Sequence, residues 1–110
     1  MVGHLADAER VGAYGALRFA RADKTELPGF DENAWVPEGL FDARPIADLA
    51  HEFAAVRASS LALFRGLPAS VLLRRGVANG QPCTVRGLAA ILAGHEAHHV
   101  AILRERYGIG

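Results

Sequence analysis

Residues 84–107 read TVRGLAAILAGHEAHHVAILRERY and carry the pattern that decides the fold. Apolar and histidine side chains recur every three or four residues along this stretch, which is the spacing of one face of an α-helix. Thr84 is a suitable N-cap, and we expect the helix to run to about Tyr107. The face positions are Leu88, Leu92, His95, His99, Ile102 and Arg106. Two positions that should face the interior of a helical bundle are therefore histidine.

Two earlier segments show the same helical spacing, from about Val2 to Ala22 and from about Pro45 to Gly66. The stripe of the first segment is His4, Ala8, Val11, Gly15, Arg18 and Ala22. The stripe of the second is Ile46, Leu49, Phe53, Val56, Ser60, Leu63 and Leu67. Pro45 suits the first helical position, where its missing N–H costs nothing. We predict an all-α fold, an up-down bundle with about three long helices, in one domain of residues 1–110.

The segments between these helices are expected to be irregular. Residues 23–44 are too long for a simple turn, and the aromatic residues Phe30, Trp35 and Phe41 favour an ordered loop packed on the bundle. In residues 67–83, Asn79-Gly80 is a strong turn signal. Val71-Leu72-Leu73 suits one short helical turn.

Composition narrows the class of protein. Twelve basic residues balance twelve acidic ones, which argues against a nucleic-acid partner. No apolar run is long enough to span a membrane, and no signal peptide is visible. The single cysteine, Cys83, cannot form an internal disulfide and suits a reducing, cytoplasmic location. Its place before the last helix would lower a thiol pKa, but a small apolar loop residue is the simpler interpretation.

The histidines of the last helix suggest a metal site. His95 and His99 are four residues apart, so one helical turn places both rings on one face. Imidazole favours zinc, nickel, copper or iron over magnesium or calcium, and a third ligand must come from elsewhere. His4 is the candidate if the first and last helices are neighbours, and Asp7 can orient an imidazole. The alternative is that these are structural histidines with hydrogen-bond partners.

Residues 95–99 also match the H-E-x-x-H pattern of zinc metalloproteases, in which the glutamate activates water. The extended pattern of such proteases is absent, because Ile102 and Glu105 occupy the places of its later glycine and histidine. We therefore disfavour a protease. Glu96 is expected to support a ligand or to face solvent, and His98 is expected at the rim of the site. His51 lies opposite the apolar stripe of its helix and should be solvated.

Several stretches together resemble one family, the DinB-like proteins. They are residues 4–10, 27–32, 94–99 and 104–107, and the likeness extends over essentially the whole chain. The resemblance implies a four-helix bundle with a divalent metal ion, often zinc or nickel, held by three histidines. Carried over to this chain, these ligands are His4, His95 and His99. Characterised relatives include thiol-dependent S-transferases and a maleylpyruvate isomerase.

The resemblance implies a metal-dependent enzyme, possible reactions being thiol-dependent S-transfer and hydrolysis. Glu96 or Asp7 would then move protons or hold ring tautomers. Arg18, Arg21, Trp35 and Phe30 are expected to line a substrate mouth. The alternative is a metal-stabilised structural or interaction protein without catalysis.

One departure from the family concerns the start of the chain. The family's first helix should precede His4, yet the sequence begins at Met1. An absent helix would expose an apolar groove, so we expect self-association as a homodimer, unless the chain is a fragment or its start is mis-assigned. The expected small partners are a substrate or a low-molecular-weight thiol, with no nucleic acid and no membrane.

Overall fold

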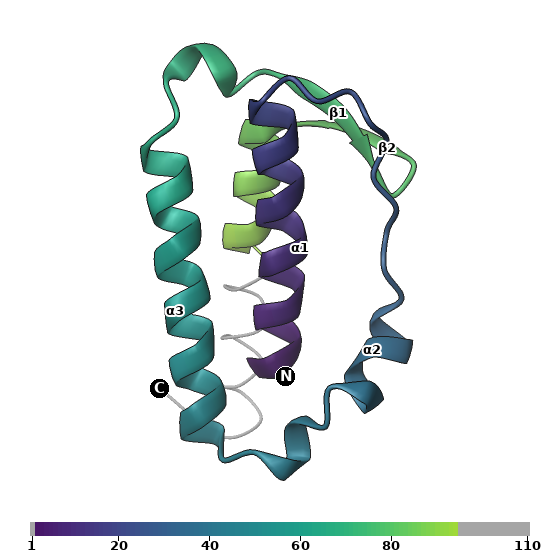
Figure 1. Ribbon diagram of the computed structural model, residues 1–110, viewed down its shortest axis with the longest axis vertical. Coiled ribbons are helices and arrows are strands. Elements are labelled where there is room, and N and C mark those ends of the chain that lie inside the picture. The colour runs from purple at the N-terminus through teal and green to yellow at the C-terminus, as the bar shows by residue number, and fades with distance from the viewer. Residues whose placement is uncertain (1, 95–110) are drawn as a thin grey trace.

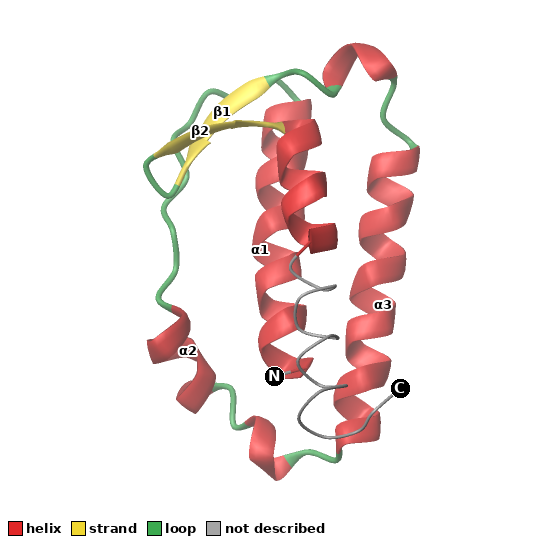
Figure 2. Ribbon diagram, turned by 180° about the vertical axis from the view of Figure 1, so that it is seen from behind, coloured by secondary structure: helices red, strands yellow, loops and turns green. Residues whose placement is uncertain are grey.

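A computed structural model gives the fold and describes residues 2–94. Two long helices, α1 (Val2–Ala20) and α3 (Ile46–Arg65), lie side by side (Figure 1). Residues 85–94 form a further helical stretch that packs along α1 in the opposite direction (Figure 2). In this pairing the Leu92 side chain lies over Gly12, and the Leu88 side chain lies over Gly15. Two of the predicted helices are present as α1 and α3, and the third is helical over residues 85–94, while its predicted remainder lies outside the described residues. α3 begins one residue after its predicted start because Pro45 is its N-cap.

α3 and residues 85–94 of the last helix bury the faces that their spacing predicts. In α3, Leu49, Val56 and Ser60 are buried, although Ile46 is 62% exposed and was wrongly placed on the stripe. Leu88 and Leu92 are both buried. The main core lies where the C-terminal half of α1 meets residues 85–94 and the chain before β1, and its buried members are Ala16, Phe19, Ala20, Val71, Val85 and Leu88.

The buried face of α1 lies one residue away from the predicted stripe. The buried side chains are Leu5, Ala6, Glu9, Ala16, Phe19 and Ala20. Ala8 and Val11 are only half-buried, and His4 keeps 12% of its side chain exposed. Ala22 falls beyond the helix, in a left-handed conformation with φ of 60°. The predicted stripe therefore lies beside the buried face of α1 instead of coinciding with it.

A β-hairpin, which the sequence analysis missed, joins α3 to the last helix. Strands β1 (Arg75–Ala78) and β2 (Gln81–Thr84) pair antiparallel, with Arg75 opposite Thr84. Asn79 and Gly80 both have positive φ, 53° and 74°, as the two-residue turn of a tight hairpin requires. The described chain is mostly helical with this small sheet, so the prediction of an all-α fold was incomplete. A 3₁₀ turn at Ala69–Val71 stands close to the predicted helical turn.

The long connection after α1 is joined to the hairpin, but the packing expected of its aromatic residues is partial, because Trp35 is 43% exposed and α2 has no buried residue. The Leu27 N–H donates to the Val77 carbonyl (2.8 Å), and the Leu27 carbonyl accepts from the Asn79 N–H (2.9 Å). This short bridge fixes the connection to the hairpin. The chain then forms the short helix α2 (Glu32–Glu38) and a 3₁₀ turn at Phe41–Ala43 before α3.

Candidate metal centre and adjoining cleft

His4 lies in the first turn of α1 and reaches toward α2. Its side chain is 12% exposed, and its Nε2 atom is 3.7 Å from Oε2 of Glu32. The other two predicted ligands, His95 and His99, lie outside the described residues, as does Glu96. Within residues 2–94 no three histidine, cysteine, aspartate or glutamate side chains gather as a metal site would need. The described part of the chain therefore provides one predicted ligand and a carboxylate beside it.

A cleft of about 870 Å³ opens on the side of α1 that carries the predicted stripe. Its described lining comes from α1, the connection with α2, the hairpin and the last helix. Its side chains are mainly apolar and include Val11, Tyr14, Leu27, Phe30, Trp35, Leu88, Ile91 and Leu92. Asp7, Arg10 and Glu32 are the charged residues of this lining. An apolar hollow with a few polar groups is the usual form of a small-molecule site.

The aromatic residues of the cleft stand where the sequence predicted a substrate mouth. The rings of Phe30 and Trp35 lie 4.5 Å apart at 42°, and both line the cleft. The predicted arginines do not join them in the described lining. Arg18 donates to the Tyr14 hydroxyl (2.6 Å) and pairs with Asp23 (2.7 Å), and Arg21 is exposed at the end of α1.

The opposite side of α1 is held to α3 by ion pairs that the sequence analysis missed. Glu9 is 3% exposed, and Arg57 donates to both of its carboxylate oxygens at 2.6–2.9 Å. This charged residue completes the buried face of α1. No spacing within α1 could reveal the pair, because its partner lies 48 residues away.

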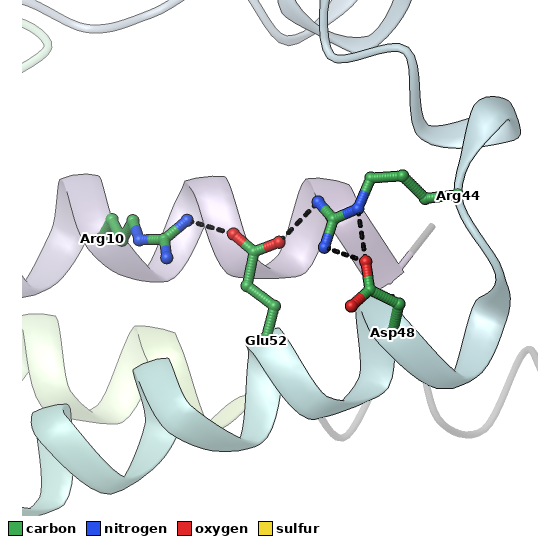
Figure 3. Close-up of polar contacts among 4 residues, drawn as sticks. All are labelled: Arg10, Arg44, Asp48 and Glu52. Atoms are coloured by element: carbon green, nitrogen blue, oxygen red, sulfur yellow. Dashed lines mark hydrogen bonds and ion pairs between the residues drawn. The ribbon is translucent and has the colours of Figure 1, made fainter.

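A second group of charges lies nearer the start of α3 (Figure 3). Glu52 accepts from Arg10 (2.5 Å) and from Arg44 (2.7 Å), and Arg44 also pairs with Asp48 (2.7 Å). The hydrogen bonds from Arg10 and Arg44 lower the pKa of Glu52 below its ordinary value. Together with the Glu9–Arg57 pair, the Arg10–Glu52 contact links α1 to α3 on this side of the bundle.

Cys83 lies on β2 and lines the cleft. Burial raises its pKa, which keeps the sulfur as a thiol near neutral pH. The interpretation of Cys83 as a small, partly buried residue fits this environment better than an activated nucleophile does.

Comparison with known sequences identifies the family of the chain. Residues 1–103 match the sequence model of the DinB superfamily. The chain belongs to the DinB superfamily. No curated protein and no solved structure matches it at a significant level. Membership supports the resemblance drawn from the histidine-bearing stretches, and it covers both His4 and the later pair His95 and His99. None of the helices in the described part of this DinB-superfamily chain has the length and apolar character to cross a membrane.

Proposed function

We propose that this DinB-superfamily chain is a divalent-metal-dependent enzyme that binds its cation, zinc or nickel, through His4, His95 and His99. The observation that carries the proposal is the antiparallel pairing of α1 with residues 85–94, in which Leu92 faces Gly12 and Leu88 faces Gly15. Moving toward the C-terminus on the last helix therefore corresponds to moving toward the N-terminus on α1.

The sequence predicts that the last helix continues to about Tyr107. On that prediction, His99 is seven residues beyond Leu92, or about 10.5 Å along the axis. His4 is eight residues before Gly12, or about 12 Å along α1. The two histidines would then be almost level on neighbouring helices, with His95 one turn away. This supports one shared cation in a bundle of the DinB type.

The surroundings of His4 fit such a cation. A largely buried imidazole whose Nε2 atom is directed toward a carboxylate belongs to a donor set that zinc and nickel accept. Three imidazoles would hold the ion and leave a coordination position open for a substrate. A divalent cation bound there lowers the pKa of a coordinated thiol or water and so provides a nucleophile at neutral pH.

The residues of the chain supply binding and proton handling. The apolar cleft, with Phe30 and Trp35 on one wall, would bind the apolar part of an electrophilic substrate. Asp7 lines the same cleft one turn from His4, so its carboxylate can accept a proton at the mouth of the site. Glu96, next to the ligand His95, is the second candidate for this role. The reaction class is thiol-dependent S-transfer or hydrolysis.

Elemental analysis of the purified protein tests the site. We expect metal in the wild-type protein, and its loss in both His4→Ala and His95→Ala. His51→Ala is the matched control, because His51 is exposed on α3. Metal retained at the wild-type level by His4→Ala and His95→Ala would refute the ligand assignment.

A second measurement separates an enzyme from a metal-stabilised structural protein. We expect the metal-loaded protein to turn over a low-molecular-weight thiol with an electrophile, and the metal-free protein to be inactive. A rise in Tm on metal binding without turnover of any thiol or ester substrate would favour the structural alternative. Self-association stays a prediction, and a monomer by light scattering at micromolar concentration would contradict it.

A further inference from the structure

One end of the bundle is strongly basic, although the chain as a whole is neutral. Both α1 and α3 end there, and the segment between α3 and β1 crosses above them (Figure 1). The described carboxylates near this end are Asp23, which pairs with Arg18 (2.7 Å), and Glu26. The exposed cations, which we call the basic end, are Arg21, Lys24, Arg65, Arg74, Arg75 and Arg86.

Hydrogen bonds hold the segments of the basic end together. Arg74 donates to the Ala20 carbonyl at the end of α1 (2.5 Å). The Val85 N–H donates to the Arg74 carbonyl (3.1 Å), and the Arg86 N–H donates to the Leu72 carbonyl (2.9 Å). The chain before β1 and the start of the last helix are thereby fixed beside the end of α1. Cations from separate segments therefore share one surface.

Helix dipoles explain only some of these cations. The C-terminal end of a helix carries partial negative charge, so Arg65 in the last turn of α3 is favourable. Arg86 is the second residue of the helical stretch that begins at Val85, and the positive end of a helix disfavours a cation. Arg75 lies in β1 directly after Arg74. These cations do not stabilise the fold, which points to an anionic partner.

The carboxylates are concentrated in the other half of the described chain. Those from α2 to the middle of α3 are Glu32, Glu38, Asp42, Asp48 and Glu52. The cations on this side, Arg10 and Arg44, both donate to Glu52 (Figure 3). The neutrality of the sequence therefore conceals a separation of charge along the molecule. The field of such a molecule would turn its basic end toward an anionic surface.

An exposed leucine lies within the basic end. Leu73 is 67% exposed and directly precedes Arg74 and Arg75. It belongs to the connection between α3 and β1, which forms one tip of the molecule (Figure 1). An apolar side chain beside arginines fits the boundary between lipid headgroups and acyl chains. The phosphate backbone of a nucleic acid would explain the charges and not the leucine, because it offers the leucine no apolar layer.

We propose that the basic end binds the surface of an anionic lipid bilayer, with its cations at the headgroups and Leu73 inserted among the acyl chains. The expectation of no membrane partner rested on the lack of a long apolar run, which concerns spanning a bilayer and not binding at its surface. Each lysine or arginine near such a surface strengthens binding about fivefold. The proposal does not depend on the metal site.

Co-sedimentation of the full chain with lipid vesicles tests the proposal. The vesicles are phosphatidylcholine with and without phosphatidylglycerol, and we expect binding only where phosphatidylglycerol is present. Raising NaCl from about 0.1 M to about 1 M shortens the screening length from about 10 Å to about 3 Å and should release the protein. Arg75→Gln/Arg86→Gln should weaken binding about 25-fold. Arg74 is left unchanged because its guanidinium holds the Ala20 carbonyl.

Matched controls separate this surface from general effects of charge and apolar area. Adding Glu38→Gln and Asp42→Asn to the double arginine variant restores the net charge of the chain, and its binding should stay weak. Leu73→Ser should weaken binding at least about fourfold, the effect of one buried methylene group. Ile46→Ser should leave binding unchanged, because Ile46 is similarly exposed (62%) but lies at the start of α3.

Equal binding to vesicles with and without phosphatidylglycerol, or wild-type binding by Arg75→Gln/Arg86→Gln, would overturn the proposal. Binding to duplex DNA and not to vesicles, lost in the same double variant, would also overturn it and make the basic end a nucleic-acid surface. Salt-sensitive self-association without vesicle binding would instead pair the basic end with the acidic half of a second copy.

Discussion

The substitution Gly76→Ala tests how the hairpin packs on α1. Gly76 lies in β1 directly against the ring of Phe19, and a Cβ atom added at Gly76 would overlap that ring. Phe19 is fully buried, with none of its surface exposed. The ring therefore cannot turn away toward solvent, and either the hairpin or the core around Phe19 must shift.

Two opposing effects determine how far Gly76→Ala changes the free energy of unfolding. Alanine in a strand is more favourable than glycine by about 0.5–1 kcal/mol, because the unfolded glycine chain has more freedom to lose. Overpacking a filled core costs about 1–3 kcal/mol. We expect the second effect to win, with a net loss of about 1–2 kcal/mol. For a domain of this size the loss lowers Tm by about 4–8 °C per kcal/mol.

Urea denaturation followed by circular dichroism measures the free energy of unfolding. Gly15→Ala is the matched control, because a Cβ at Gly15 would meet Leu27 and Leu88 at an ordinary 3.5 Å. That variant should be more stable than the wild-type protein by about 0.5–1 kcal/mol. Phe19→Leu should reduce the cost of Gly76→Ala, since the smaller side chain leaves room for the added methyl group. If Gly76→Ala is as stable as the wild-type protein, the packing of the hairpin on Phe19 is wrong.

Three further experiments test the ion pairs of Glu9 and Glu52 and the environment of the Cys83 thiol. Glu9→Gln should lower the free energy of unfolding by about 2–3 kcal/mol, because it removes the charge that accepts both hydrogen bonds from Arg57; an unchanged urea midpoint would contradict this. Folding lowers the pKa of Glu52. The contribution of Glu52 to the free energy of unfolding should therefore be present above about pH 4.3, the pKa of an unfolded glutamate, and should be lost as the pH falls through the lower pKa of the folded state. The wild-type protein and Glu52→Gln should then differ in the free energy of unfolding in urea at pH 7, and the difference should vanish at a pH low enough to protonate Glu52. A difference that does not change with pH would exclude the ion pairs of Glu52 as its source. Because burial raises the pKa of Cys83, iodoacetamide should alkylate it more slowly than a small free thiol at pH 8, and equal rates would contradict the partly buried environment.

Apolar spacing was enough to predict α1, α3 and the described part of the last helix, but it did not predict the short helix α2 in a connection that was expected to be irregular. In α3 the stripe through Leu49 and Val56 is buried as expected, because long amphipathic segments carry a strong periodic signal. In α1 the buried face is displaced by one residue from the predicted stripe, and it includes the charged residue Glu9. Its burial depends on Arg57, a long-range partner that periodicity within one helix cannot reveal.

The hairpin was missed because its strands are short and weakly patterned. Residues 75–78 read RGVA and residues 81–84 read QPCT, with glycine and proline in places that ordinarily weaken strands. Only the Asn79-Gly80 turn was visible in advance. For the site, helical spacing put His4 on the same stripe as Ala8, Val11 and Gly15, which line the cleft, although His4 is not itself part of the described lining. It gave no indication of Glu32, which reaches His4 from another element.

The segment between the Leu27 bridge and Phe41 is attached at both ends, and between them Glu32 contacts His4 of α1. At one end Leu27 is hydrogen-bonded to the hairpin; at the other the Phe41 ring lies against the backbone of Gly3. Between these attachments the chain lies outside the main core, so its length can change without moving the long helices. Insertions or deletions there would alter the size of the hollow that a ligand meets while leaving the scaffold intact.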